Sequence, residues 1–313
     1  MPDVTVSAWR SDRAQPWQYL LLREARIFFR FTWRDLSAAV IPALLFMIAA
    51  VRASEPTEPL LAMLAALARG LPYFSLYVYS FCLSNQIAGV EEDRVNKPDR
   101  PIPAGLVSIE GAKLRWRVVM VLFPAVAFGL GGFELLAWAV ARQIISVLHN
   151  FLGWSQHWFT KNPILMGLGV VAMLAPAWRM ITDFSPLVWR WILLIALAVG
   201  VSISVQDLRD IEGDRLRGRK TLPLSIGETP ARLLLSALCL LLPVATGLLL
   251  RGDAGTAPVA LLFDLIVTGL CVAIAVRLLV LRTPSADHKT YMLWTYWYCA
   301  ELLSASFVLP LIR

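Results

Sequence analysis

The feature that most constrains this chain is a series of long apolar stretches. A bilayer core of about 30 Å is crossed by a helix of about 20 apolar residues, and nine stretches of the sequence meet that requirement. They cover residues 35–53, 66–89, 116–132, 133–151, 163–182, 186–206, 231–250, 257–281 and 291–311. These stretches are too long and too evenly apolar for the alternating strands of a membrane barrel. The sequence therefore predicts an all-α, polytopic membrane protein with nine transmembrane helices.

The composition agrees with this class. Hydrophobic residues make up 58% of the 313 positions, charged residues only 16%, and the mean hydropathy is +0.64, which does not describe a soluble domain. The net charge of +7 is concentrated in a few loops. We interpret it as a topology signal and in part as an attraction to anionic lipid headgroups. The lipid bilayer is therefore a partner, no nucleic acid is expected, and no obligatory protein partner is evident.

Lys and Arg gather in the loops after the second and sixth apolar stretches, and such residues in short loops mark the cytoplasmic side. The first loop contains Arg94, Lys97, Arg100, Lys113, Arg115 and Arg117, and the second contains Arg209, Arg215, Arg217, Arg219, Lys220 and Arg232. Both loops and the N-terminus are predicted to be cytoplasmic. Residues 1–34 mix aromatic residues with Arg and lack the features of a signal peptide. They are expected to form an interfacial segment, or a simple topology anchor, before a transmembrane domain over 35–313.

The two basic loops resemble each other in sequence. Aligning Asp93 with Asp214 places "NQIAGVEEDRVNKPDRPIP", residues 85–103, over "QDLRDIEGDRLRGRKTLP", residues 206–223. Below we call them the first and second motif segments. Both run through an Asp-Arg pair to a basic cluster and a Pro. They indicate a parallel duplication that places both polar segments on one side of the membrane.

Acidic and amide side chains recur at helical spacing in both motif segments. Residues three or four positions apart share one face of a helix. The two predicted rows are Asn85, Gly89 and Asp93, and Asp207, Asp210 and Asp214. Clustered carboxylates at a membrane boundary need a counter-charge, and oxygen ligands without nearby His or Cys select a hard cation such as Mg²⁺. We therefore expect Mg²⁺ as cofactor, with catalytic and metal-binding roles for Asn85, Asp93, Asp207, Asp210 and Asp214.

Basic side chains flank both rows. Guanidinium and ammonium groups bind diphosphate oxygens, so these residues predict a diphosphate-binding site. The candidates are Arg94, Lys97, Arg100, Arg215, Arg219 and Lys220, together with Lys161, which precedes the fifth apolar stretch. A positive-inside anchor explains Lys161 about as well.

The two motif segments resemble those of a known protein family. The second motif segment resembles the DxxDxEGD motif of the UbiA-type membrane prenyltransferases, and the first resembles that family's NxxxDxxxD motif with the following "NKPDRPIP". The resemblance spans essentially the whole chain. It implies nine helices around a central cavity open to the bilayer, with a cytoplasmic cap formed by the loops after the second and sixth helices. It also implies that an isoprenyl diphosphate is bound through two or more Mg²⁺ ions and ionised.

The first motif segment departs from the family pattern. That motif usually reads NDxxDxxxD, and Gln86 and Gly89 stand where two aspartates are expected. The first ion is then held more weakly, or Glu91 or Glu92 compensates, although neither shares the predicted row. Glu92 is accordingly a further candidate metal ligand, and a solvated capping role is the alternative.

The altered first motif resembles a branch of the family that acts as membrane-bound terpene cyclases. Transfer and cyclisation both begin with ionisation of an allylic diphosphate on a metal clamp, but a cyclase needs a water-excluding, aromatic-lined cavity. The chain has 12 Trp, 14 Phe and 7 Tyr, although such residues also gather at membrane interfaces. We expect a class I type terpene cyclase acting on farnesyl diphosphate. The alternatives are a prenyltransferase with an aromatic acceptor and, from another class, a transporter or a non-catalytic scaffold.

Several polar residues inside the apolar stretches are left open by this assignment. Intramembrane ionisable groups are often functional, and four of them keep the transporter alternative open, although a parallel repeat disfavours it. They are Arg69, Arg142, Asp264 and Glu301. We expect Glu301 to pair with Arg142 or Arg277 if it is charged. His149 and Asn150 either line the cavity or are hydrogen-bonded structural residues.

Overall fold

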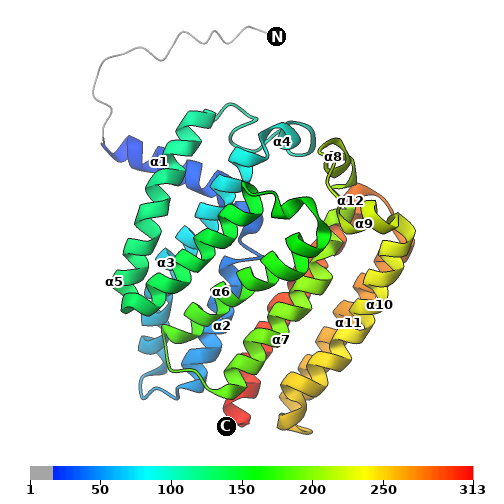
Figure 1. The fold of residues 1–313 in the computed structure, drawn as a ribbon. Helices are drawn as coiled ribbons and strands as arrows, with labels where there is room; N and C mark the ends of the chain where they lie inside the picture. Colours follow the sequence, from blue (N-terminus) through cyan, green and yellow to red (C-terminus); the bar gives the residue numbers. More distant parts are fainter. Residues whose placement is uncertain (1–16, 313) are drawn as a thin grey trace.

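The computed structural model describes residues 17–312, which are helical nearly throughout. The α-helices are α1 (Trp17–Thr32), α2 (Val40–Ala53), α3 (Pro59–Ala88), α4 (Val90–Asn96), α5 (Ile109–Asn150), α6 (Gly167–Arg179), α7 (Pro186–Ser202), α8 (Ile211–Leu216), α9 (Leu222–Ile226), α10 (Glu228–Thr246), α11 (Pro258–Val280) and α12 (Pro284–Val308) (Figure 1). Short 3₁₀ segments are η1 (Trp33–Asp35), η2 (Trp154–Gln156), η4 (Ile203–Leu208), η6 (Gly252–Ala254) and η7 (Leu309–Leu311), and π-helical segments are η3 (Thr160–Met166) and η5 (Gly247–Arg251). The described part contains no β-strand, so the all-α prediction is confirmed.

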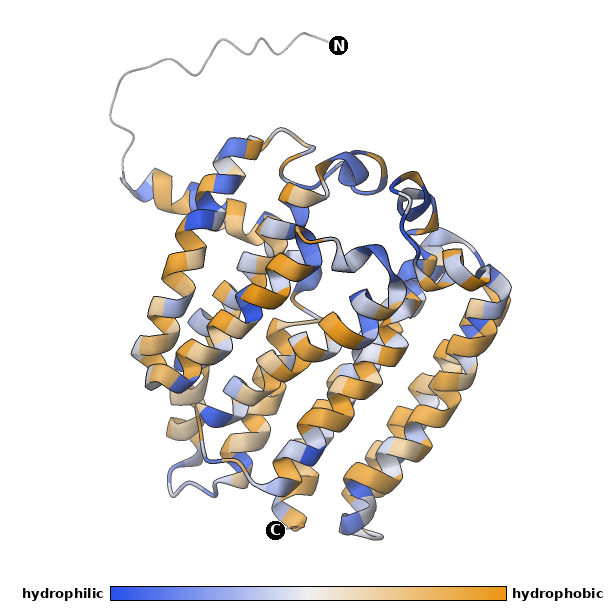
Figure 2. Ribbon diagram, in the orientation of Figure 1, coloured by the Kyte–Doolittle hydropathy of each residue, from blue (hydrophilic) through white to orange (hydrophobic). Residues whose placement is uncertain are grey.

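Five helices are long and apolar enough to cross a membrane, or six if the bent pair 17–35 and 40–53 counts as one span. The five are 59–88, 109–150, 186–208, 228–254 and 258–280. Figure 2 shows that apolar residues dominate the middle of the bundle, whereas hydrophilic residues concentrate where α4 and α8 lie. The chain is thus a multi-pass membrane protein.

Helix α5 is interrupted in its middle by two glycines. Gly131 and Gly132 leave the helical region, and Gly132 has a φ of 64°, which glycine adopts at no steric cost. The two halves run antiparallel, because Trp116 near the start packs against Phe151 just after the end, with 5.2 Å between the ring centroids. The break falls at the boundary that the sequence predicts between the third and fourth apolar stretches.

The long helices pack into a ring. Helix neighbours along the chain are neighbours in space from α2 to α7 and from α10 to α12; α7 contacts α10, and α12 packs against α2. Helix α2 also packs against α6, where Phe46 and Trp178 are buried with 5.4 Å between their rings. This contact fills the part of the ring away from α4 and α8, so the cavities described below lie nearer to those two helices.

Helix α1 lies across one end of the bundle (Figure 1). It is bent by 79° from α2. It buries Ile27 and Phe31 while Trp17 and Leu22 stay exposed, which suits a helix in the headgroup plane. Arg34, just after α1, pairs with Asp99 of the first motif segment at 2.6 Å. The N-terminal part of the predicted interfacial segment, residues 1–16, lies outside the described residues.

Glu301 pairs with Arg251, so the prediction that its partner is Arg142 or Arg277 is wrong. Arg251 and Glu301 are both fully buried and in direct contact, and Arg251 Nε donates to Asp264 Oδ1 at 2.6 Å. Pairing offsets part of the cost of burying these charges. Arg251 lies just beyond the apolar stretch predicted over 231–250, whereas in the structure η5 continues α10 through Arg251 and buries this side chain.

Candidate active site

The first motif segment begins on α3 and continues on α4. The helix breaks at Gly89, which has φ −102° and ψ 15°, and a Cβ there would lie 2.9 Å from the Asn85 carbonyl oxygen. Asn85, Gly89 and Asp93 line one cavity, and Glu92 lines it too. The predicted row assumed a continuous helix and left Glu92 outside it. The break at Gly89 is the physical reason why Glu92 also reaches the cavity.

The second motif segment runs from η4 through a turn into α8. Asp210 and Asp214 line the same cavity. Asp207 does not; it is 1% exposed, and its carboxylate accepts from Lys161 Nζ at 2.6 Å and from Asn162 Nδ2 at 2.9 Å. Lys161 in turn lines the cavity, so Asp207 acts on the cavity through the lysine in this structure.

Together the motif segments enclose a polar cavity, which we call the polar chamber. Its lining residues are Asp35, Phe81, Asn85, Gly89, Glu92, Asp93, Lys97, Arg100, His149, Lys161, Met166, Gln206, Arg209, Asp210, Asp214 and Arg219. The two segments also touch directly, because a Cβ on Gly213 would lie 1.8 Å from Asn96 Nδ2. Glycine at this position therefore allows α8 to approach α4 closely.

Three predicted diphosphate-binding residues lie outside the lining of the polar chamber. Arg94 is exposed and pairs with Glu91 at 2.7 Å. Arg215 and Lys220 are exposed as well, and the Lys220 backbone forms a bridge with His157. The backbone changes direction within each motif segment, and these three side chains therefore point away from the chamber. The sequence alone does not reveal these changes of direction.

The acidic side chains of the motif segments are held by cations. The pairs are Asp93–Arg100 at 2.7 Å, Asp210–Lys97 at 3.6 Å, Asp214–Arg219 at 2.9 Å and Glu92–Arg219 at 3.1 Å. Burial raises the pKa of the Asp93 carboxyl more than the facing Arg100 lowers it, and burial likewise raises the pKa of Asp214. Burial lowers the pKa of the Lys97 amino group. The carboxylates and the cations of the chamber thus neutralise each other. An anionic ligand could replace the carboxylates as partners of the cations, and a metal could replace the cations as partners of the carboxylates.

The donor set suits a hard cation. Carboxylate and amide oxygens of both motif segments face the chamber, and oxygen ligands are those that Mg²⁺ takes. Asp214 Oδ2 is buried without a hydrogen-bond partner among the described residues, so one ligand atom is free. In residues 17–312 no three acidic, His or Cys side chains are placed to hold a metal ion as they stand, because basic groups occupy the space between the carboxylates.

Asn85 is oriented by Asn150, the last residue of α5. Its Nδ2 donates to Asn150 Oδ1 at 3.2 Å, and Asn150 Nδ2 donates to Ser84 Oγ at 2.8 Å. His149 Nδ1 lies 2.8 Å from Asn150 Oδ1. His149 lines the polar chamber, which is the first alternative given for this pair. Asn150 is a hydrogen-bonded structural residue, which is the second.

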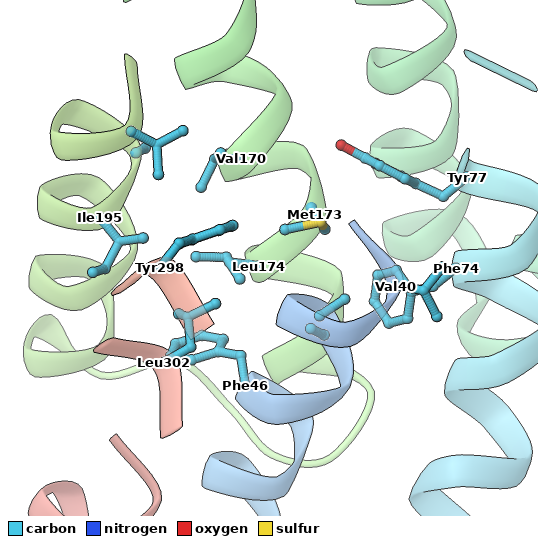
Figure 3. Close-up of a cluster of buried hydrophobic side chains, with 14 of the residues drawn as sticks. Val40, Phe46, Phe74, Tyr77, Val170, Met173, Leu174, Ile195, Tyr298 and Leu302 are labelled. Carbon is cyan, nitrogen blue, oxygen red and sulfur yellow. The ribbon is translucent and has the colours of Figure 1, made fainter. Parts of the chain in front are cut away.

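A second, mainly apolar cavity continues from the polar chamber, and we call it the aromatic chamber. Its aromatic lining consists of Tyr77, Phe81, Tyr291, Trp294 and Tyr298. Figure 3 shows Tyr77 from α3, Val170 and Met173 from α6 and Tyr298 from α12 within one buried hydrophobic cluster that also contains Phe46 and Leu302. Asp35, Phe81, Met166 and Gln206 line both chambers, so the two are contiguous.

Arg142 lies in the wall of the aromatic chamber. It is 5% exposed, and its guanidinium carbon is 4.3 Å from the Tyr77 ring centroid and 4.5 Å from that of Phe81. Its Nε has no hydrogen-bond partner in the described part of the chain. Cation–π contact with two rings offsets part of the cost of burying this charge.

Sequence reasoning missed two charged residues of the polar chamber. Arg209 lies inside the second motif segment, 3.3 Å from Asp210. Its position next to Asp210 in the sequence could have indicated that it belongs to the site. Asp35 lies at the break between α1 and α2, outside both motif segments. Gln86, which replaces an aspartate of the family pattern, does not line the polar chamber; its Nε2 donates to the Phe31 carbonyl of α1 at 3.2 Å.

Comparison with known proteins decides the family. The model of the UbiA prenyltransferase family matches residues 39–297. This chain belongs to the UbiA prenyltransferase family. The prediction made from the two motif segments is confirmed.

Relatives of this UbiA-family protein include both cyclases and transferases. It is 39% identical to the somaliensene A/B synthase of Streptomyces somaliensis over 92% of this chain and 94% of that protein. It is 37% identical to the diterpene cyclase eriG of Hericium erinaceus, covering 90% and 88%. The polyprenyl transferase eriF of the same fungus is 34% identical, covering 90% and 94%.

Solved structures confirm the fold of this UbiA-family protein. A digeranylgeranylglyceryl phosphate synthase superimposes with a TM-score of 0.63 over 92% of this chain and 99% of that chain, at 17% identity. A UbiA homolog from Archaeoglobus fulgidus bound to GPP and Mg²⁺ gives a TM-score of 0.59 over 91% and 99%, at 14% identity. At these identities the similarity shows the fold alone.

Proposed function

We propose that this protein is an Mg²⁺-dependent terpene cyclase that ionises an isoprenyl diphosphate in the polar chamber and cyclises its chain in the aromatic chamber. The observation that carries this proposal is the contiguity of the two chambers. An amphiphilic substrate needs a charged compartment that opens directly into an apolar one, and four residues line both. The names of two relatives, a terpene synthase and a diterpene cyclase, support the same reaction.

The basic residues of the polar chamber would bind the diphosphate. Lys97, Arg100, Lys161, Arg209 and Arg219 all line it, and charge-assisted hydrogen bonds to such groups are strong. Each now holds a carboxylate of the chamber or of its wall. A bound diphosphate would take over as their partner and leave the carboxylates available to a metal.

Asn85, Glu92, Asp93, Asp210 and Asp214 would hold Mg²⁺, with Asp207 joining them if it releases Lys161. We infer two or more ions, because carboxylates from both motif segments face the chamber and Mg²⁺ uses only one or two protein carboxylates each. When bound, the metal neutralises the diphosphate and makes it a better leaving group. Magnesium and GPP bound to the Archaeoglobus fulgidus homolog support this assignment.

The aromatic chamber would protect and fold the cation. Its rings can stabilise a positive charge by about 0.5–2 kcal/mol each. Tyr77 donates its hydroxyl to the Gly169 carbonyl at 2.7 Å, and Trp294 Nε1 donates to Ser202 Oγ at 2.8 Å. Both donor hydrogens are thus held by protein acceptors, which fixes the orientation of the two rings, whereas the Tyr298 hydroxyl in the same lining has no hydrogen-bond partner among the described residues.

We infer nine membrane crossings for the ring. They are α2, α3, the two halves of α5, η3 with α6, α7, α10, α11 and α12. The loops with α4, α8 and α9 would form a cytoplasmic cap over the polar chamber, because basic residues concentrate there. Helix α1 would lie at the same surface as part of an N-terminal interfacial segment.

The proposal predicts turnover without an acceptor. Purified protein mixed with farnesyl diphosphate and Mg²⁺ is expected to release diphosphate and a cyclic hydrocarbon, measured by a diphosphate assay and by gas chromatography with mass spectrometry. Geranylgeranyl diphosphate is the second substrate to test, since eriG is a diterpene cyclase. Chelation with EDTA is the control and should stop the reaction reversibly. The proposal would be overturned if neither substrate yielded hydrocarbon and an aromatic acceptor were prenylated.

Prenyl transfer is the second candidate function. The same polar chamber would serve it, and the similarity to the polyprenyl transferase eriF favours it specifically. A transferase would have to admit a polar acceptor beside the first carbon of the prenyl chain. A transporter or scaffold would release no diphosphate, with or without acceptor.

Restoring an aspartate of the family pattern tests what decides the reaction. In Gly89→Asp the new Cβ would lie 2.9 Å from the Asn85 carbonyl oxygen and 3.7 Å from Arg217 Nη1, so the α3–α4 joint must shift slightly. We expect a change in the Mg²⁺ concentration needed for half-maximal activity, with hydrocarbon still the product. Gly89→Ala is the matched control for the backbone shift. Prenylation of an aromatic acceptor by Gly89→Asp, absent in Gly89→Ala, would show instead that the motif selects the reaction.

A further inference from the structure

Asp35 occupies a place that neither motif segment accounts for. It ends η1, the short turn between α1 and α2, and it lines both the polar and the aromatic chamber. The side chain is therefore at the junction where the diphosphate end of a substrate would meet its hydrocarbon chain. The turn is fixed by its neighbours, because Arg34 pairs with Asp99 and Gln86 donates to the Phe31 carbonyl.

Asp35 differs from the other acidic residues of the polar chamber in having no cationic partner within 4 Å among the described residues. Those four, from the motif segments, each have a Lys or Arg within 4 Å. Asp35 has none among the described residues, although Lys97, Arg100 and Arg209 line the same chamber. Its only side-chain hydrogen bond there comes from Cys82 Sγ, 3.2 Å from Oδ2, so Oδ1 is unpaired.

No other anionic side chain of the described residues lines the aromatic chamber. The opposite charge there belongs to Arg142, which cannot accept a proton. The Tyr77 hydroxyl and the Trp294 ring nitrogen are committed as hydrogen-bond donors. The Tyr298 hydroxyl lines the chamber without a hydrogen-bond partner among the described residues, but a neutral phenol is a much weaker base than a carboxylate. Among the side chains that line the aromatic chamber, the Asp35 carboxylate is therefore the strongest base available to a carbocation.

We infer that Asp35 is the proton acceptor that ends the carbocation sequence, an inference that rests on the proposed cyclase function. In this step a C–H bond next to the cationic carbon breaks, its electron pair forms the C=C bond of the product, and the proton binds Asp35 Oδ1. The proton then passes to the released diphosphate in the adjoining polar chamber. The balance is one isoprenyl diphosphate to one cyclic alkene and one hydrogen diphosphate, with the carboxylate regenerated.

The position of Asp35 also sets which proton is lost. A base at the junction reaches carbons near the diphosphate end of the folded chain and not those near Phe46 and Leu302, where the ring is filled. Removing the base should therefore change the product more than the rate of ionisation.

The test compares Asp35→Asn and Asp35→Glu with the wild type in detergent micelles, with isoprenyl diphosphate and Mg²⁺. Two quantities are measured, diphosphate release and the hydrocarbon profile for each diphosphate released. Asp35→Asn is expected to keep diphosphate release within about threefold, while the share of the native alkene falls about tenfold or more and other alkenes or water-capture alcohols replace it. Asp35→Glu keeps a carboxylate and should recover part of the native product. Asp253→Asn, at an exposed ion pair with Arg190, is the matched control and should match the wild type.

An unchanged hydrocarbon profile in Asp35→Asn would overturn the inference. So would a large loss of diphosphate release with the residual product unchanged, because Asp35 would then act in ionisation. If Asp35→Asn does not fold, the profile of Asp35→Glu decides, since a moved carboxylate must alter the alkene ratio. Failure of the wild type to form hydrocarbon without an acceptor would count against the proposed function and not against Asp35 in particular.

Discussion

Asp214→Asn is expected to lower kcat by roughly 10²–10³-fold, because a lost ligand to the leaving-group metal removes about 3–4 kcal/mol of transition-state stabilisation. Asp214 Oδ2 is buried and has no hydrogen-bond partner among the described residues. The amide keeps the size of the side chain and can still accept from Arg219, which now donates to Oδ1 at 2.9 Å. The substitution therefore removes charge and metal affinity with little change in packing. Steady-state diphosphate release over a range of Mg²⁺ concentrations measures the effect.

A structural role for Asp214 predicts a different pattern. Arg219 also pairs with Glu92, so the guanidinium keeps a partner and the thermal stability in detergent should change little. Loss of activity together with loss of folded protein would indicate a structural residue. Near-normal turnover would contradict the site assignment.

Lys161→Met is expected to abolish turnover and to destabilise the fold by about 3 kcal/mol, because it leaves a buried carboxylate without its cation. Asp207 is 1% exposed and Lys161 lies 2.6 Å from it. The amide of Asn162 is the other donor to this carboxylate in the described residues, and a neutral donor does not replace a charge. Thermal denaturation in detergent and diphosphate release measure the two effects.

The double variant Lys161→Met/Asp207→Asn separates stability from activity. Removing both charges should recover most of the stability, since replacing a buried ion pair by neutral groups is often neutral. Activity should stay lost, because neither the diphosphate-binding cation nor the adjacent carboxylate is restored. Lys113→Met, which breaks an exposed pair with Glu110, is the control and should resemble the wild type. Recovery of full activity in the double variant would show that Lys161 serves only to neutralise Asp207.

The apolar stretches and the motif segments predicted much of the structure, because both follow from strong local constraints. A bilayer requires long helices, and Gly131 with Gly132 divides two of them at the predicted boundary. Charged residues at helical spacing collect on one face, and Asn85, Asp93, Asp210 and Asp214 do line one chamber. The family assignment that rests on the same segments is confirmed.

Breaks in the helices limited the prediction of individual side chains. Gly89 turns the chain between α3 and α4, so the helical rows do not predict that Glu92 faces the chamber and Arg94 faces outward. The π-helical segment η5 extends the helix beyond the apolar stretch predicted over 231–250, and its last residue, Arg251, becomes the buried partner of Glu301. Such turns depend on tertiary packing and leave little signal in local periodicity.

Contacts between distant segments were the least predictable. Asp35 has no sequence pattern that links it to the motif segments, and only the 79° bend between α1 and α2 brings it to the junction of the chambers. Arg142 packs on Tyr77 and Phe81 from another helix. Its charge indicated a special role, but spacing did not show that aromatic rings rather than Glu301 would surround it.

A structure of the protein with Mg²⁺ and a non-hydrolysable farnesyl diphosphate analogue would show directly whether one substrate occupies both chambers. We expect the diphosphate in the polar chamber between the two motif segments, with metal between it and Asp93, Asp210 or Asp214. The prenyl chain should pass Phe81 and Asp35 and fold against Tyr77, Trp294 and Tyr298. A prenyl chain that extends outside the helical ring, with the aromatic chamber left to another molecule, would contradict cyclisation in that chamber.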